Sequence, residues 1–169
     1  GEIRSYPFGE ATAHIIGYVG RISEAEIAQA QEKGAKDPIF RLPGFRIGKT
    51  GVEKKYDETL RGTAGRTSAE VNVVGREIRE LEKVSPKKGK RLTLTLDADL
   101  QMQCQEMLMR EKSASAVVMD AQTGEVYALC SFPGFDPNLF SRGIPADLWS
   151  ELLANETNPL TNKAVSGQY

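Results

Sequence analysis

Residues 115–138, SAVVMDAQTGEVYALCSFPGFDPN, decide the fold of this chain. Two apolar runs, 116–119 and 126–130, flank a polar connection that contains Gly124. A glycine can adopt the positive φ that closes a hairpin loop with a bulge. The prolines near the end of the stretch cannot donate a ladder hydrogen bond, so they end the second strand. The stretch therefore predicts an antiparallel hairpin. Neither run alternates cleanly between apolar and polar residues, which is typical of strands that a complete fold covers on both faces.

The residues before the hairpin predict a strand and a helix that pack beside it. Leucines alternate with polar residues over 92–96, which predicts a short strand. Asp97 can cap the following helix, which we expect to run to about residue 111. That helix carries four apolar residues, Leu100, Cys104, Met107 and Leu108. It can shield one side of the hairpin, so we expect an uncovered apolar face on the other. We also expect at least one exposed edge, because a helix does not pair with the backbone of an edge strand.

The remaining segments predict short helices, loops and a second hairpin. Ser23 and Glu26 form a capping box at the start of a helix that we expect to end near Gly34. Prolines and glycines punctuate 35–48, which predicts a loop. Residues 139–169 predict short helical turns and loops, with one helix starting at Pro145.

A third helix and a second hairpin complete the first half. The helix is predicted over 52–60, with one apolar stripe made by Val52, Tyr56 and Leu60. Alternating apolar residues predict a hairpin over 66–84 that turns at 74–76. The next segment, 85–90, has no apolar residue. We therefore expect a boundary there between two domains, 1–90 and 91–169.

The composition is that of an ordinary globular protein. The 169 residues are 40% hydrophobic and 27% charged, with a net charge of −1. This balance gives no electrostatic reason to bind nucleic acid or an anionic membrane surface, so we expect neither. No apolar run approaches the roughly 20 residues that cross a bilayer, so we expect no membrane segment here. The chain starts at Gly1 without an initiator methionine, and we interpret it as part of a longer protein.

Cysteine and histidine are too few to build a metal site. The two cysteines, Cys104 and Cys130, lie among apolar residues and are interpreted as small buried hydrophobes. A bridge between them stays open in an oxidising compartment. The single histidine, His14, lies in an apolar run and is expected to pack in a core or an interface. We expect no metal and no cofactor.

Several short segments carry a family resemblance, and they keep their order along the whole chain. The hairpin contributes DAQTGEVYAL at 120–129 and SFPGFDPN at 131–138. Further matches are GKTGVEKKYD at 48–57, LRG at 60–62, LTLD at 94–97, LQ at 100–101, NKA at 162–164 and GQY at 167–169. In these segments the chain resembles the class B penicillin-binding proteins. Tyr6-Pro7 and AHIIGYV at 13–19 are most similar to the elongation-type members.

The resemblance implies a fold and a parent enzyme. The implied fold is α+β: residues 1–90 as the pedestal, or dimerisation-type, domain, and 91–169 as the N-terminal helix and hairpin of a truncated transpeptidase domain. The implied parent is a periplasmic peptidoglycan serine D,D-transpeptidase of cell-wall elongation, acylated by β-lactams and anchored to the bacterial inner membrane. Its implied partners are the glycan polymerase and the scaffold protein of the elongation complex, and a homodimer stays open. The chain itself would position the catalytic domain and bind these partners.

Three strings resemble catalytic or phosphate-binding motifs by letter only. Residues 44–50 would need a glycine where Pro43 stands to form a P-loop. The Lys-Thr-Gly triplet at 49–51 falls, by the resemblance, in the non-catalytic part. Ser85-Pro86-Lys87-Lys88 lies in a charged linker, whereas an activated serine needs a helix N-terminus and a desolvated lysine. The resemblance places the true Ser-x-x-Lys beyond Tyr169. We therefore expect no catalytic residue in this chain, which should be inactive.

The alternative is a self-sufficient periplasmic protein-interaction module without a catalytic domain. The missing Ser-x-x-Lys motif favours this alternative. The hairpin of 115–138 argues against it, because a pedestal alone does not need a hairpin that is apolar on both faces. A hydrolase with another site is disfavoured, because a single histidine in a helix leaves no Ser, His and acid constellation to assemble.

Overall fold

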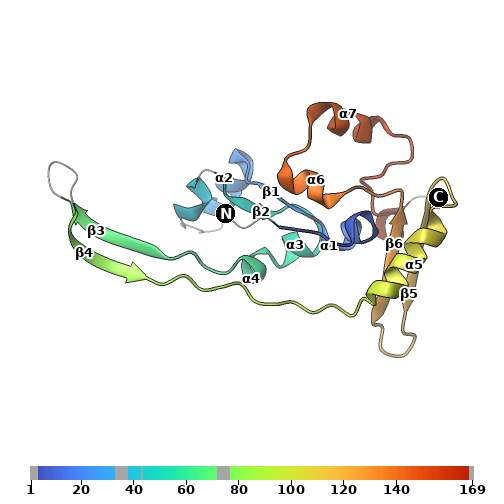
Figure 1. Cartoon of the computed structure of the whole chain (residues 1–169), viewed down its shortest axis with the longest axis horizontal. Helices are drawn as coiled ribbons and strands as arrows, with labels where there is room; N and C mark the ends of the chain where they lie inside the picture. Colours follow the sequence, from blue (N-terminus) through green and yellow to red (C-terminus); the bar gives the residue numbers. More distant parts are fainter. Residues whose placement is uncertain (1–3, 33–37, 43, 72–76, 168–169) are drawn as a thin grey trace.

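The structure is a computed structural model that describes residues 4–32, 38–42, 44–71 and 77–167. It mixes helices with three two-stranded antiparallel sheets, which confirms the α+β prediction. Figure 1 shows an elongated molecule in which the β3–β4 hairpin forms an arm at one end. The β5–β6 hairpin and most of the C-terminal helices lie at the other end, with β1–β2 between them.

The predicted central hairpin is confirmed. Strands β5 (Ala114–Met119) and β6 (Val126–Phe132) pair antiparallel, with a register shift between Val118 and Met119. The Asp120 carboxylate closes the loop by accepting hydrogen bonds from the backbone N–H groups of Gln122 and Thr123, both at 2.7 Å. Gly124 has a φ of 76°, as a bulged loop of this kind requires.

The helix before the hairpin, α5 (Ala98–Leu108), begins as predicted but ends earlier and turns a different face inward. The Asp97 side chain accepts a hydrogen bond from the Leu100 N–H at 2.9 Å, which confirms the N-cap. The end expected near residue 111 is wrong, because the helix stops at Leu108. Met107, expected on the apolar face, is 66% exposed, whereas Gln101 and Gln105 are buried. The buried face of the helix therefore carries the side-chain carboxamides of Gln101 and Gln105.

One edge of the hairpin is closed by side chains, which corrects the expectation that this segment leaves it unpaired. The Leu129 N–H donates to Gln101 Oε1 at 2.8 Å, and Gln101 Nε2 donates to the Leu129 carbonyl at 2.9 Å. Nearer the loop, the Asp97 N–H donates to the Tyr127 carbonyl at 2.9 Å. The carboxamide reproduces the donor and acceptor pair of a neighbouring strand, so the backbone groups of Leu129 are satisfied without one.

The strand predicted over 92–96 is wrong. These residues run extended and their leucines alternate half-buried with exposed polar residues, but they join no sheet. The contact is limited to hydrogen bonds such as Thr95 Oγ1 to the Val126 carbonyl at 2.7 Å. The uncovered apolar face that we expect for the hairpin is confirmed within the described residues. There β5 pairs only with β6, and exposed apolar side chains remain at Val117, Val118 and Met119.

The pedestal half is built around a small sheet that the sequence did not reveal. Strands β1 (Val19–Arg21) and β2 (Arg46–Gly48) pair antiparallel, so the loop predicted over 35–48 contains a strand. Between them lie α2 (Glu24–Glu32) and the 3-10 helix Pro38–Arg41. The capping box is confirmed, since the Ser23 N–H donates to Glu26 Oε2 at 2.8 Å and the Glu26 N–H to Ser23 Oγ at 3.3 Å. The end near Gly34 lies outside the described residues.

The helix predicted over 52–60 is two short helices, α3 (Gly51–Lys55) and α4 (Asp57–Arg61). Tyr56 separates them, with φ −115° and ψ 23°. This break rotates the expected stripe, so Tyr56 is 42% exposed whereas Glu53 is only 5% exposed. The prediction of a buried Tyr56 is therefore wrong.

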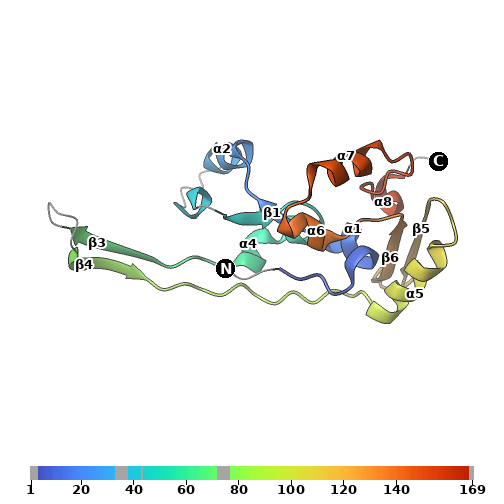
Figure 2. The same ribbon diagram turned by 45° about the horizontal axis from the view of Figure 1, so that its top comes forward.

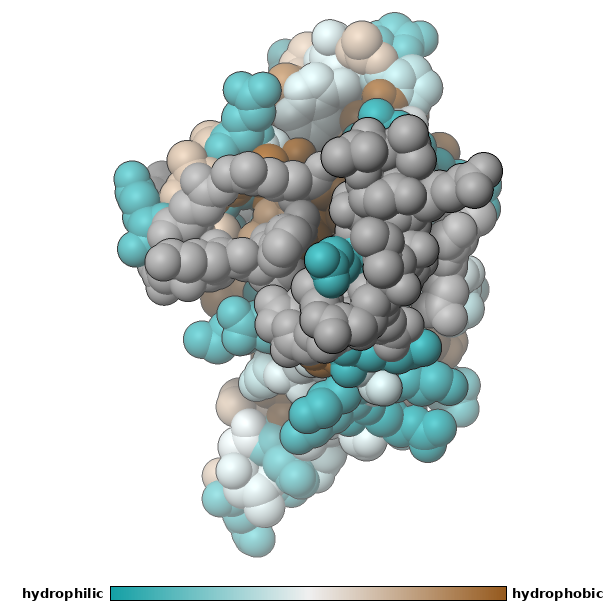
Figure 3. Space-filling view, turned by 90° about the vertical axis from the view of Figure 1, so that its left-hand side faces the viewer, coloured by the Kyte–Doolittle hydropathy of each residue, from teal (hydrophilic) through white to brown (hydrophobic). Residues whose placement is uncertain are grey.

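The arm consists of β3 (Arg66–Val71) and β4 (Glu77–Val84), which confirms the second hairpin. Its predicted turn at 74–76 lies outside the described residues. In Figures 1 and 2 the chain leaves β4 and returns along the molecule to α5 as a long extended connection. Seen from the end of the arm, the described surface in Figure 3 is mainly hydrophilic, with apolar residues in recessed places.

The core is shared by the two ends of the chain. The 3-10 helix Gly9–Thr12 and α1 (Ala13–Ile16) lie against β6 and α6 (Pro137–Arg142). Ala13, Phe135 and Phe140 form the buried cluster, with Tyr18 packed against it. Helices α7 (Ala146–Ala154), which starts after Pro145 as predicted, and α8 (Lys163–Ser166) complete this end.

Candidate functional site

A set of side-chain hydrogen bonds joins the N-terminal segment to the hairpin half. The Asn138 carboxamide bonds twice to the Tyr6 backbone, accepting from its N–H at 3.0 Å and donating to its carbonyl at 3.0 Å. Glu10 Oε1 accepts a hydrogen bond from the Gly134 N–H at 2.7 Å. Gln101 Nε2 donates to the Ala11 carbonyl at 2.6 Å. We call these three side-chain contacts the joint, and they fix residues 6–11 against β6 and the segment that follows it.

An ion pair between the exposed Arg4 and the buried Glu53 supports the joint on the pedestal side. Arg4 Nε lies 2.8 Å from Glu53 Oε1, and Arg4 Nη2 donates to Glu53 Oε2 at 3.0 Å. The Tyr6 hydroxyl accepts from the Val19 N–H at 2.9 Å and donates to Glu53 Oε1 at 3.5 Å. Burial, and then the Glu53 carboxylate, raise the pKa of Tyr6 to about 12. The phenol therefore stays neutral and ties β1 to α3 as a structural group.

The histidine and the buried lysine lie beside the aromatic cluster. The rings of His14 and Phe135 meet edge to face with centroids 5.2 Å apart, which confirms the expected packing role of His14. Burial, and then the charge of Lys163, lower the pKa of His14 to about 4. Lys163 is 8% exposed, and its Nζ donates to the Asn158 carbonyl at 3.1 Å. Burial lowers the pKa of Lys163 as well.

The two cysteines are free thiols in this structure. Cys130 has no exposed surface, and its Sγ donates to the Gln101 carbonyl at 3.5 Å. Burial, and then the neighbouring Cys104, raise the pKa of Cys130 to about 12. The Cys130 thiol is therefore a packed hydrophobe with little thiolate character, as the sequence predicted.

The strings that resemble motifs do not assemble a site within the described residues. Lys49 Nζ pairs with Glu26 Oε2 at 2.5 Å instead of standing beside a serine. Ser85 lies in an exposed, extended segment and not at a helix N-terminus. Among the described residues, no group of three or more His, Cys, Asp or Glu side chains could hold a metal ion. The expectation of no catalytic residue, metal or cofactor stays a prediction.

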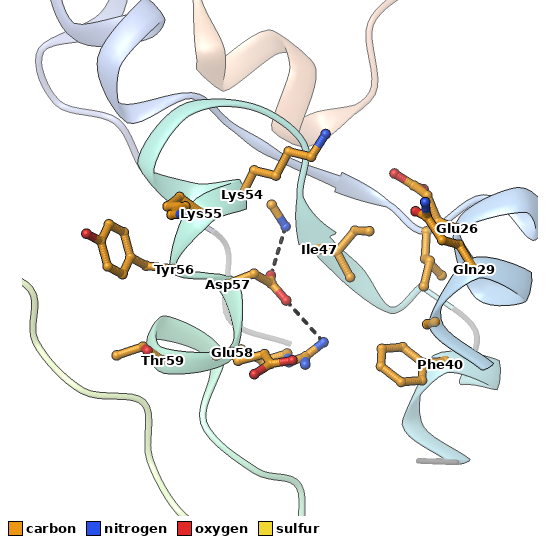
Figure 4. A pocket seen from close by; sticks show the side chains of 14 residues that line it. Glu26, Gln29, Phe40, Ile47, Lys54, Lys55, Tyr56, Asp57, Glu58 and Thr59 are labelled. Atoms are coloured by element: carbon orange, nitrogen blue, oxygen red, sulfur yellow. Dashed lines mark hydrogen bonds and ion pairs between the residues drawn. The ribbon is translucent and has the colours of Figure 1, made fainter. Parts of the chain in front are cut away.

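A pocket of about 470 Å³ opens between α2 and the α3–α4 pair. In Figure 4, Asp57 lies at the centre of one wall, with Glu26 and Phe40 across from it. The Asp57 carboxylate accepts from the Gly48 N–H at 2.8 Å and lies 3.3 Å from Arg61 Nη1. The guanidinium of Arg61 in turn lies over the Phe40 ring at 5.4 Å. Because these charges neutralise one another, the wall is a stabilised part of the pedestal surface.

The residues that make the joint were missed from the sequence. Gln101 stands in the apolar pattern of a helix, and Asn138 follows a proline, which is typical of a loop. A polar residue of either kind is usually exposed. Their partners lie 90 and 132 residues away along the chain, so no local signal could have identified them.

No helix among the described residues is long and apolar enough to cross a membrane.

Solved structures with a similar fold are penicillin-binding proteins. A complex of PBP2 and MreC from Helicobacter pylori matches with a TM-score of 0.77 and 32% identity, over 95% of this chain and 28% of that one. Pseudomonas aeruginosa PBP2 in complex with WCK 5153 matches with a TM-score of 0.75 and 33% identity, over 98% of this chain and 31% of that one.

Curated sequences agree with the structures. Peptidoglycan D,D-transpeptidase MrdA of Escherichia coli K12 is 41% identical over 170 residues, which cover 98% of this chain and 26% of the relative. The enzyme of the same name from Acinetobacter baumannii is 40% identical, over 98% of this chain and 24% of the relative. The chain thus spans about a quarter of the length of these relatives.

Two family models match the chain, and together they cover most of it. Residues 1–94 match the penicillin-binding protein dimerisation domain, and residues 114–169 match the penicillin-binding protein transpeptidase domain. The arm and the small β1–β2 sheet fall in the first match, and the hairpin with α6–α8 falls in the second. The contacts between Asn138 and Tyr6 and between Glu10 and Gly134 link the two matches. The chain belongs to the penicillin-binding protein family, and the elongation-type resemblance of its sequence is matched by its similarity to PBP2 structures.

Proposed function

We propose that this chain is the non-catalytic first part of a peptidoglycan D,D-transpeptidase of cell-wall elongation. In this role it positions the catalytic domain and binds the partners of the enzyme. The observation that carries the proposal is the joint, in which Asn138, Glu10 and Gln101 hold the N-terminal segment on the transpeptidase half. A pedestal that is fixed in this way can transmit the orientation of a partner to the catalytic domain.

The joint suits a positioning role because its contacts are directional. The two hydrogen bonds between Asn138 and Tyr6 allow one relative orientation, since donor and acceptor of each group must face each other. The aromatic cluster of Tyr18, Phe135 and Phe140 packs on the same side and contributes hydrophobic stabilisation. Packing holds the two parts together, and the carboxamide bonds set their orientation. The boundary near residue 90 between domains 1–90 and 91–169 stays part of this proposal.

The proposed partners are a scaffold protein and the glycan polymerase of the elongation complex. One of the similar structures is a PBP2 bound to MreC, which supports a scaffold partner of that kind. The pocket between α2 and α3–α4 offers this pedestal a recessed surface for such contacts. We place the chain in the periplasm, as part of a protein anchored to the inner membrane, and a homodimer stays a further possibility for the dimerisation-type domain. The match of 114–169 to a transpeptidase argues against a self-sufficient interaction module.

We further propose that the chain does not react with β-lactams. The serine of Ser85-Pro86-Lys87-Lys88 lies in an exposed, extended segment, without the helix N-terminus and the desolvated lysine that activate a serine. The chain incubated with a labelled penicillin should show no mass shift in the intact protein. A stoichiometric adduct that disappears in Ser85→Ala would contradict the assignment of the chain as non-catalytic.

The partner role is tested by binding the 169-residue chain to the purified periplasmic part of an MreC protein in a calorimeter. Micromolar or tighter binding is expected, and it should persist when Gln103, an exposed residue of α5, is changed to alanine. Asn138→Ala should leave this pedestal contact intact but loosen the joint, which is read as faster hydrogen exchange over residues 6–11. Absence of MreC binding at concentrations up to about 1 mM, equivalent to about 4 kcal/mol, would refute the partner role.

A further inference from the structure

A second, larger cavity lies between the β1–β2 sheet and the α6–α7 helices. Its volume is about 830 Å³, which is within the range of about 300–1,000 Å³ of ligand pockets. One wall comes from β1 and β2 and carries Arg21, Arg46 and Lys49. The facing wall comes from the end of α6 and the start of α7. Figures 1 and 2 show these elements adjoining one another, with α6 beside β1.

The basic wall contains a feature that costs stability. Arg21 and Arg46 are direct cross-strand partners in the β1–β2 register, so their side chains leave the same face of the sheet. Like charges in directly opposite positions destabilise a strand pair. Within the described part of the chain, neither arginine has a carboxylate partner, and no acidic residue lines the cavity. An electrostatic repulsion that no neighbouring carboxylate offsets is typical of a binding site.

The rest of the lining supplies a fourth cation and an aromatic floor. Arg142 ends α6 at the cavity and is exposed. Tyr18 and Phe140 pack with centroids 4.5 Å apart, and Trp149 meets Phe140 edge to face at 6.0 Å. Trp149 remains 37% exposed. Arginine together with exposed tryptophan and tyrosine is the composition of binding hot spots.

We propose that this cavity is a docking site for a short acidic peptide segment of a partner protein, with carboxylates flanking an apolar side chain. The guanidinium groups of Arg21, Arg46 and Arg142 would bind the carboxylates, and the aromatic floor would contact the apolar side chain. Lys49 contributes less charge, because it is already paired with Glu26. The proposal rests on the proposed function in that it assumes a partner, and it adds the chemistry by which one is recognised.

The charge balance of the chain favours a short segment over a nucleic acid as the ligand of this cavity. The whole chain has a net charge of −1, so it lacks the extended basic field that binds a polyanion. A free inorganic anion would be satisfied by two guanidinium groups and would leave the aromatic floor unused. A segment with both carboxylates and an apolar side chain uses all the chemistry of the cavity.

The chain carries one tryptophan, Trp149, so its emission reports directly on this cavity. The probe is the capped peptide Asp-Glu-Leu-Asp-Glu, titrated into the 169-residue chain with fluorescence and calorimetry in parallel. We expect saturable binding that weakens as salt is raised to about 1 M, because exposed charges are screened. The matched peptide Asn-Gln-Leu-Asn-Gln should not bind. No saturable signal from the acidic peptide, or equal affinity for the amide peptide or for inorganic pyrophosphate, would overturn the proposal.

Two variants test the residues. Arg46→Gln and Arg142→Gln should each weaken peptide binding about five- to tenfold, the loss of a partly exposed charged contact. Arg110→Gln, which removes the same charge from an exposed position outside the cavity, should not. Arg46→Gln should also keep or raise the thermal midpoint, because it relieves the repulsion with Arg21. Equal weakening in all three variants would contradict the proposal. Binding of MreC with no peptide binding would refute this inference alone, and the reverse result would refute the proposed partner role alone.

Discussion

Replacing Gln101 with leucine nearly preserves the side-chain volume but removes a carboxamide that is only 1% exposed. That carboxamide makes three hydrogen bonds, to the Ala11 carbonyl and to both backbone groups of Leu129. Each backbone group left buried and unpaired costs about 1–3 kcal/mol. The added apolar contact of leucine offsets part of this, and the costs of neighbouring groups do not add fully. We therefore expect Gln101→Leu to lower the free energy of unfolding by about 2–4 kcal/mol.

The same helix provides a matched control. Gln105 is buried at 6% exposure, but its Nε2 and Oε1 have no partner within the described part of the chain. Gln105→Leu removes two unpaired polar atoms and should be neutral or stabilising. Both variants are measured by urea unfolding, with the midpoint and the slope compared to the parent chain. A loss for Gln101→Leu below about 0.5 kcal/mol, or a loss for Gln105→Leu as large as that for Gln101→Leu, would refute the assignment of Gln101 as the residue that closes the edge of β6.

Three further predictions concern packing, pH and thiol reactivity. Tyr56→Ala should cost less than about 0.5 kcal/mol because its side chain is exposed, whereas Phe135→Ala should cost about 3–5 kcal/mol, both by urea unfolding; comparable costs would place Tyr56 in the core after all. His14 has a folded pKa of about 4 against about 6.5 unfolded, so its stabilising effect is full above pH 6.5 and is lost as pH falls through 4, up to about 3 kcal/mol. His14→Phe keeps the ring and should flatten this pH dependence, and an unchanged profile would contradict it. In the native chain a disulfide reagent should label the partly exposed Cys104 and leave the buried Cys130, with its raised pKa, unlabelled until unfolding; equal rates would refute this.

Local signals in the sequence were enough for the elements that are stabilised by their own residues. The β5–β6 hairpin was predicted from the two apolar runs around Gly124, and the start of α5 from the N-cap Asp97. The Ser23 capping box and the β3–β4 arm were predicted in the same way. In each case the groups that pair with the backbone lie a few residues apart or across one turn. The local sequence is therefore sufficient to predict the element.

The candidate site was decided by the tertiary structure. Alternation at 92–96 indicated a strand, but its partner groups on β6 were taken by side chains and by a few single bonds, so no sheet formed there. The apolar spacing of 52–60 indicated one helix, but the break at Tyr56 rotated the stripe and buried Glu53 beside Arg4. In the same way, Arg21 and Arg46 became neighbours in the larger cavity only through the β1–β2 pairing, which the sequence did not predict.

The sequence by itself determined the family, the α+β class and the positions of its locally stabilised elements. The tertiary structure decided which polar residues are buried and what they hold. From the sequence, Gln101 is expected on the surface of a helix and Asn138 in a loop. In the folded chain, Gln101 bonds to Ala11 and Asn138 to Tyr6, which both come from the N-terminal end. A buried carboxamide is stable only when its donors and acceptors are paired. Those partners are supplied by segments 90 and 132 residues away, so the pairing exists only in the folded chain.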